Sequence, residues 1–460
     1  MNIFRDEHND LKKDYRYARN ICRLLQGQGF QAVFAGGVVR DMLLEVDYSD
    51  IDIATNCTYD RLLKILAFFN EAKIKEVGKA FGVVLITIDG YDFEIAQFRT
   101  DHNCDGRKPS SVQLCSMEED AKRRDFTMNA VFYDPISEEF HDFVGGMEDI
   151  QNRKLKFVGN AEDRIKEDYF RILRYVRFIC RTFTYDAQEK ELVDSMSADL
   201  LKYVSVERIQ IELMTKIFTE KNISVYLKHF PILMKTLFPE VVALENIEQD
   251  PRWHPEGSAL THTDIIFMHL VGNGASPRLL LAGLFHDTGK DLTTEIKDGK
   301  ISSHGHENVS EEITRRWMTF MKFSNDDIEY VCGLVKDHMK LHQRGMSKST
   351  LRKLMAKPYF YDLLCLNCCD ILASSNDFIV YDDYCARIEK IESSTLPDRL
   401  VTGKDLIDLG LKPSEQFGTI LNFLFDAQLE GKFSTTEEGI QYLIENGKEF
   451  GIELFLMNGG

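Results

Sequence analysis

The feature that most constrains the fold is a change of hydrophobic pattern near residue 150. Before it, short β-branched runs such as QAVFAGGVV and GVVLITI alternate with helical stretches, which predicts a small α/β domain built on a sheet. After it, apolar residues recur at spacings of three and four, beginning with EDRIKEDYFRILRYVRFICRTF, which predicts helices. We therefore expect an α/β fold followed by all-helical domains.

The chain is too long for a single hydrophobic core, since it has 460 residues. Charged stretches that contain proline, at 245–257 and 393–405, divide the helical part further. The sequence therefore predicts four domains, namely an α/β head at 1–150, a helical neck at 151–245, a second helical domain at 246–395 and a helical tail at 396–460.

Composition restricts the class of protein. Hydrophobic residues make up 44% of the chain and charged residues 28%, which is typical of a globular protein. The first residues lack the apolar centre of a secretory signal, and no apolar run has the length of a membrane span, so we expect a cytoplasmic protein without a membrane partner. A net charge of −18 argues against a polyanionic partner unless a basic surface forms locally.

The densest signal is FAGGVVRDMLLEVDYSDIDIATN, residues 34–56. Gly36 and Gly37 follow an apolar run, where absent side chains let backbone N–H groups approach phosphates, and Arg40-Asp41 are expected to open a helix. Asp50 and Asp52 would share one face of a strand over 49–55. Two such carboxylates can hold Mg²⁺, which activates a 3′-hydroxyl and neutralises charge on a transferred phosphoryl group, and Glu94 can add a third acidic group.

These residues resemble the polymerase-β-like nucleotidyltransferases, and among them the class II CCA-adding enzymes and poly(A) polymerases. The family's G-G-x-V-R-D and D-x-D match the residues from Gly36 to Asp52, and KRRDFTMNA at 122–130 resembles its R-R-D-F-T-x-N-A. The resemblance implies a head with a small mixed sheet, Asp50 and Asp52 as catalytic Mg²⁺ ligands, and a nucleotide site that includes Gly36, Gly37, Arg40, Arg123 and Arg124.

The segment Glu167 to Arg171 is similar to the family's E-D-x-x-R motif, whose Asp and Arg read the incoming base. On one helix Asp168 and Arg171 would be neighbours, presenting an acceptor beside donors. Cytosine and adenine both show an amino donor next to a ring-nitrogen acceptor, whereas guanine and uracil do not. Arg174 and Arg177 would extend a cationic flank that suits triphosphate or RNA. The alternative is an ordinary salt bridge on the surface of a helix.

The second half holds a pattern of potential metal ligands. His262, His286, Asp287 and Asp370 follow the order H…HD…D and resemble the HD-domain phosphohydrolases, which implies a second divalent metal of unknown identity at 246–395. His306 and His338 can be further ligands, phosphate contacts or surface histidines. A degenerate, structural HD domain is the alternative.

The resemblance implies template-independent addition of CCA to tRNA 3′ ends from CTP and ATP, with Mg²⁺ and release of pyrophosphate. Enzymes that add only A or only CC, and poly(A) polymerases, are alternatives of the same class. The segment Asp105 to Pro109 resembles the loop needed for A addition and favours complete CCA. A metal phosphohydrolase with a nucleotide-binding head is the alternative of another class, and a non-catalytic RNA-binding protein would need neither carboxylate set.

Overall fold

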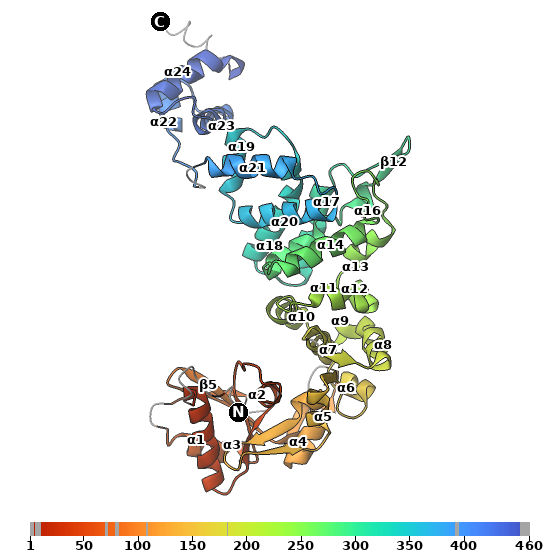
Figure 1. The fold of residues 1–460 in the computed structure, drawn as a ribbon. Coiled ribbons are helices and arrows are strands. Elements are labelled where there is room, and N and C mark those ends of the chain that lie inside the picture. The colour runs from red at the N-terminus through yellow and green to blue at the C-terminus, as the bar shows by residue number, and fades with distance from the viewer. Residues whose placement is uncertain are drawn as a thin grey trace. The chain divides into compact units, whose positions relative to one another are not determined.

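The computed structural model describes residue 4 and residues 11–69, 72–78, 82–106, 109–181, 183–391 and 395–450. The chain forms two compact units, Met1–Val242 with Phe320–Lys322 and Ala243–Thr319 with Phe323–Gly460 (Figure 1). The four-domain division at 1–150, 151–245, 246–395 and 396–460 is finer than this and stays a prediction.

The first unit begins with strands and helices in alternation and continues with helices. The elements of its α/β part are α1 (Lys13–Gly27), β1 (Ala32–Ala35), α2 (Gly37–Leu43), β2 (Asp52–Thr55), α3 (Tyr59–Leu66), β3 (Lys73–Gly78), β4 (Val83–Ile88), β5 (Tyr91–Gln97), β6 (Arg99–Cys104), β7 (Pro109–Leu114), α4 (Met117–Arg123), β8 (Val131–Asp134), β9 (Glu139–Asp142) and α5 (Gly146–Gln151). They are followed by β10 (Lys154–Leu155), α6 (Ala161–Glu167), α7 (Arg171–Cys180), β11 (Thr184–Tyr185), α8 (Ala187–Met196), α9 (Leu200–Tyr203), α10 (Val206–Glu212), α11 (Ile223–Tyr226), α12 (Pro231–Leu237) and α13 (Pro239–Val242).

The seven-stranded sheet is mixed, in the order β3-β4-β5-β2-β1-β8-β9. β2 and β5 run parallel, and the other neighbouring pairs are antiparallel. β1 lies inside the sheet and all its residues are buried, whereas buried and half-buried residues alternate along β4. The predicted head with a small mixed sheet is confirmed.

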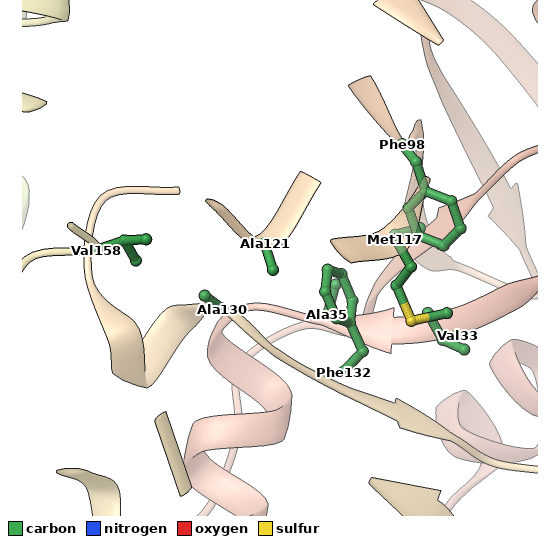
Figure 2. Packing of buried hydrophobic residues seen from close by; sticks show 9 residues of the cluster. Val33, Ala35, Phe98, Met117, Ala121, Ala130, Phe132 and Val158 are labelled. Carbon is green, nitrogen blue, oxygen red and sulfur yellow. The ribbon is translucent and has the colours of Figure 1, made fainter. Parts of the chain in front are cut away.

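The core beneath the sheet joins the strands to α4. Val33 and Ala35 of β1 pack with Phe98, Met117 and other buried residues of the cluster, namely Ala54, Ala121, Ala130, Phe132 and Val158 (Figure 2). α4 begins with a capping box, in which Ser116 accepts from the N–H of Glu119 and the Glu119 carboxylate accepts from the N–H of Ser116. This packing sets the position of the arginines at the end of α4.

An aromatic cluster attaches the helical part to the same region. Phe126 lies 4.9 Å from Phe157 and 5.5 Å from Phe178 between ring centroids, and Phe157 stacks on Tyr175 at 5.5 Å. All four rings are buried, and such pairs add about 0.5–1.5 kcal/mol each beyond burial. α7, which carries Phe178, is therefore held against the segment that follows α4.

The second unit is helical apart from one short hairpin among its described residues. Its elements are α14 (Ala259–Gly272), α15 (Pro277–Phe285), α16 (Lys290–Thr293), β12 (Glu295–Lys297), β13 (Lys300–Ser302), α17 (His306–Phe320), α18 (Asn325–Asp337), α19 (Lys348–Met355), α20 (Phe360–Ala373), α21 (Ile379–Glu389), α22 (Gly403–Asp408), α23 (Gln416–Leu429) and α24 (Thr436–Asn446). Ser258 and Ser276 cap the first turns of α14 and α15 through side-chain oxygens. The predicted helical character after the head is confirmed.

No helix in the described ranges combines the length and the apolar character needed to cross a membrane.

Candidate functional sites

The turn from β1 into α2 borders the candidate nucleotide site. Gly36 has φ +74°, and a Cβ at this residue would lie 3.7 Å from Nη1 of Arg124 and 3.8 Å from Oδ2 of Asp52. α2 begins at Gly37, so the expectation that Arg40-Asp41 open the helix is wrong, because the chain turns into the helix directly at the glycine pair. The positive φ favours glycine at this turn, which lies beside Asp52 and Arg124.

Arg40 is buried behind this turn. Its Nη1 donates to Oδ1 of Asn129 at 2.9 Å, its Nη2 lies 2.7 Å from Asp41, and its guanidinium carbon lies 5.2 Å from the ring centroid of Phe178. These contacts brace the segment that follows α4. The role of Arg40 in nucleotide binding stays a prediction.

The acidic residues lie on or beside two parallel strands, with Asp52 at the start of β2 and Glu94 in the middle of β5. β2 begins at Asp52 and not at residue 49, so Asp50 precedes the strand, is exposed and accepts from the Ser49 hydroxyl. Ile53 pairs with Ile95 across the strands, which puts Asp52 beside Glu94. Burial, Asp50 and Glu94 raise the pKa of Asp52 to about 7, against the influence of Arg124.

This crowding of carboxylates fits a divalent cation. Among the described residues, every set of three potential metal ligands whose ligand atoms lie within 4.8 Å of one another belongs to the second unit. The head carboxylates therefore do not enclose a metal site by themselves. Mg²⁺ commonly binds through one or two carboxylates together with substrate phosphates, which is the arrangement that Asp52 and its acidic neighbours allow.

One buried carboxylate pairs with both arginines at the end of α4. Arg123 donates through Nε to Oδ1 of Asp120 at 2.9 Å, and Arg124 donates through Nη2 to Oδ2 at 2.9 Å. Burial alone would raise the pKa of Asp120, but Arg124 and Arg123 hold it below its usual value. Arg124 also donates to the carbonyl oxygen of Asn129 at 3.1 Å. Both guanidinium groups are thereby held in place before any ligand binds.

The segment predicted to read the base is a break between two helices. α6 ends at Glu167, Asp168 is extended with φ −152° and ψ 103°, and α7 begins at Arg171. The expectation that Asp168 and Arg171 lie on one helix is wrong. Asp168 forms an isolated β-bridge with Gly106, and the N–H of Tyr169 donates to the Gly106 carbonyl instead of to a carbonyl of the helix.

Asp168 and Arg171 have different partners in this break. The Arg171 guanidinium donates to Glu167 at 2.8 Å and to the carbonyl oxygens of residues 164 and 123 at 2.7 and 3.1 Å. Asp168 accepts from the N–H of Phe170 at 3.1 Å, and Arg208 lies 3.7 Å from its Oδ2. The alternative of a simple salt bridge between Asp168 and Arg171 on a helix surface is not what the structure contains.

These groups line one cavity of about 480 Å³. The predicted residues that line it are Asp52, Arg123, Arg124, Asp168, Arg171 and Arg174, together with Glu94. Asp50, Gly37, Arg40 and Arg177 do not line it; Arg177 donates to Glu212 at 2.8 Å. The sequence interpretation missed Arg99, Asp125, Phe170 and Arg208. Arg208 stands in the S-V-E-R segment at 205–208, on α10.

In the second unit, four histidines point one ring nitrogen at a common centre. Nδ1 of His286, His306 and His338 lies 2.6–2.8 Å from a backbone carbonyl, and Nδ1 of His262 lies 2.6 Å from Glu256. Such outward hydrogen bonds fix the tautomer and leave Nε2 of each ring to a metal. His262 comes from α14, His286 and Asp287 follow α15, His306 begins α17, His338 follows α18, and Asp370 comes from α20.

The inward-facing atoms meet around two carboxylates. Nε2 of His262 lies 3.1 Å from Asp370 and 3.9 Å from Asp287, and Nε2 of His286 lies 3.2 Å from Asp287. The other oxygen of Asp287 lies 3.2 Å from Nε2 of His306 and 3.9 Å from Nε2 of His338. His306 and His338 are buried, so the alternative that they are surface histidines is excluded.

The histidine nitrogens and carboxylate oxygens of this cluster fit a divalent ion. Nε2 of His286 is buried without a hydrogen-bond partner in the described structure. Two groups of potential ligands, His262 with His286 and Asp370, and Asp287 with His306 and His338, each have their ligand atoms within 4.8 Å of one another. Burial alone would raise the pKa of Asp287, but His286 and Lys290 hold it well below its usual value. A cavity of about 410 Å³ reaches this cluster, and its walls also carry Trp253, His254, Lys290, His304 and His342.

Two segments of the chain match known domain families. Residues 32–156 match the poly A polymerase head domain, and residues 262–359 match the HD domain. Over 203 residues the chain is 39% identical to a CCA-adding enzyme of Bacillus cytotoxicus, which is 44% of this chain and 49% of that enzyme. The chain thus spans about half the length of the curated relatives that it matches.

Solved structures share the fold over nearly the whole chain. A CCA-adding enzyme of Bacillus stearothermophilus in complex with CTP superposes with a TM-score of 0.69, at 23% identity over 96% of this chain and 99% of that one. A Thermotoga maritima CCA-adding enzyme complexed with tRNA_CCA superposes with a TM-score of 0.58, at 20% identity over 94% of both chains. The chain therefore has one segment similar to the poly A polymerase head domain and one similar to the HD domain, and it shares the fold of these solved CCA-adding enzymes.

Proposed function

We propose that the first unit adds C and A to the 3′ end of tRNA, using CTP and ATP, without a nucleic-acid template and with release of pyrophosphate. The observation that carries this proposal is that one cavity holds Asp52, several arginines and the Asp168–Arg171 turn. A triphosphate needs cations, a transferred phosphoryl group needs carboxylate-bound Mg²⁺, and a base needs a polar edge. The relatives that were solved with CTP and with tRNA support the same reading.

Each group in the cavity has a role in this proposal. Asp50 and Asp52 would hold Mg²⁺, with Glu94 beside them, and the ion would supply charge neutralisation at the phosphates. Arg123, Arg124 and Arg174 provide positive charge for the triphosphate. Asp168 accepts from the amino group of C or A, and Arg171 donates to the ring nitrogen beside it. Guanine and uracil would place a carbonyl against the carboxylate, which a desolvated site penalises.

Incubation with tRNA that lacks its 3′ CCA tests the proposal. CTP and ATP are offered separately and together, and product length is read on a sequencing gel. Complete CCA requires both nucleotides and stops after three additions. Products that end after CC, a single A on tRNA that already ends in CC, or a long A tract would each establish one of the alternatives. Asp105 and Gly106 of the loop assigned to A addition are described, whereas Arg107 and Lys108 lie outside the described residues.

We propose a second activity for the HD domain, hydrolysis of a phosphoester at the cluster of His262, His286, Asp287 and Asp370. The observation behind it is the convergence of inward-facing histidine nitrogens on two carboxylates, which suits a divalent metal and a bound hydroxide. Metal analysis of the purified chain and hydrolysis of phosphomonoesters and 2′,3′-cyclic phosphates test it. Absence of both metal and hydrolysis would make the domain structural.

The expected location in the cytoplasm, with tRNA as partner and no membrane partner, belongs to the same proposal. Fractionation of cells that express the tagged chain checks it.

A further inference from the structure

Arg208 reaches the base-reading turn from a different helix. It lies on α10, outside the residues predicted to bind the nucleotide, and its side chain is 43% exposed. Its guanidinium carbon lies 4.3 Å from the ring centroid of Phe170, and its Nη2 lies 3.7 Å from Oδ2 of Asp168. Stacking on Phe170 thus aims a positive charge at Asp168 along the cavity wall.

The other arginines around Asp168 have close acidic partners of their own. Arg171 is paired with Glu167 at 2.8 Å, and Arg174 is paired with Asp125 at 2.5 Å. The Asp168 carboxylate also accepts from the N–H of Phe170 at 3.1 Å. Arg208 is thus a cation that contacts both Asp168 and Phe170.

The chemistry of base reading depends on the protonation state of Asp168. As a carboxylate it only accepts, which selects the amino groups of C and A. As a carboxylic acid it also carries an O–H donor, which would bond to the carbonyl of G or U. Burial raises the pKa of Asp168, and Arg208 is the leading group that lowers it, followed by the Phe170 N–H, Arg171 and Arg174.

We propose that Arg208 is a specificity-determining positioning residue, which holds Asp168 as an ionised acceptor directed into the nucleotide cavity. The inference rests on the proposed nucleotide addition and concerns its fidelity. It assigns to α10 a part in choosing the base, although α10 is separate from the α6–α7 turn that carries Asp168.

The test is the pH dependence of nucleotide discrimination. kcat/KM is measured for all four nucleotides on trimmed tRNA at pH 6.0 and 8.5, and the ratios of C to U and of A to G are compared within each pH, so that effects common to all nucleotides cancel. The test variants are Arg208→Gln and Arg208→Lys. The control is Lys202→Gln, which removes one positive charge from an exposed lysine nearby. Asp168→Asn serves as the reference for a neutral side chain.

Wild type and Lys202→Gln should keep their ratios within about threefold between the two pH values, while Arg208→Gln should lose about tenfold or more at pH 6.0 and recover at pH 8.5. Arg208→Lys should restore most of the discrimination. Asp168→Asn should discriminate poorly between the nucleotides at both pH values. Unchanged ratios in Arg208→Gln, or ratios that stay low at pH 8.5, would overturn the inference. A wild type without preference for C and A would refute the proposed function itself, before any variant is compared.

Discussion

Asp120→Asn tests whether one buried carboxylate positions both arginines of the nucleotide cavity. Asp120 is 1% exposed and pairs with Arg123 at 2.7 Å and Arg124 at 2.9 Å. Asparagine keeps the volume but removes the charge, so Arg124 loses its carboxylate partner and Arg123 keeps only Asp101, at 3.2 Å. Removing one member of a buried pair costs about 3–5 kcal/mol. Glu118→Gln on the same helix is the control, because its pair with Lys122 is more than half exposed and contributes about 0.3–0.5 kcal/mol.

The assay has to report on the head alone, because a chain with several domains does not unfold in two states. Hydrogen exchange of the amides in α4 and β8 measures local opening, and amides in α14 provide an internal reference. A loss of about 3 kcal/mol corresponds to a fall of about two powers of ten in protection. C addition should fall at least about tenfold in kcat/KM, since the arginines lose their orientation. Protection and activity equal to those of Glu118→Gln would refute the reasoning.

Four further outcomes are expected. Asp52→Ala should abolish nucleotide addition and leave HD activity intact, as measured by parallel assays on trimmed tRNA and a cyclic phosphate. Asp168→Ala should lower the use of C and A about tenfold or more and reduce discrimination against G and U, and an unchanged preference in kcat/KM would contradict base reading by this residue. His286→Ala should remove bound metal, as measured by elemental analysis, and spare tRNA extension. The lowered pKa of Asp120 contributes stability that is present above about pH 3.9 and is lost as pH falls through the folded pKa, so protection in α4 should drop in acid and Asp120→Asn should not show that drop.

The residues of the head site were predictable where the residue type and the order of the motifs along the chain identify them. Asp52, Arg123 and Arg124 are brought to one cavity, and periodicity alone predicted the change from sheet to helices. The backbone conformation between these residues was less predictable. The residues from Glu162 to Arg177 have an uninterrupted helical pattern, yet the helix breaks at Asp168.

Tertiary contacts explain this break. The carbonyl of Gly106, far away in sequence, takes the N–H of Tyr169, and Tyr169 stacks on Tyr203 at 4.2 Å. Local helix propensity differs between ordinary residues by less than about 0.7 kcal/mol, so contacts from two distant segments outweigh it. Arg208 was missed for the same reason, since its place opposite Asp168 depends on how α10 packs and not on its own spacing.

The two sites also differ in what holds their ligands. In the HD cluster, backbone carbonyls fix Nδ1 of three histidines, and Glu256 fixes the fourth, so every imidazole is oriented by the fold itself. In the head, Asp52 lies near Asp50 and Glu94, and burial together with these like charges raises its pKa to about 7. Like charges held this close repel unless a cation lies between them. The geometry of the histidine cluster therefore exists before an ion binds, whereas the proposed site at the head carboxylates would need Mg²⁺ and the triphosphate to complete it.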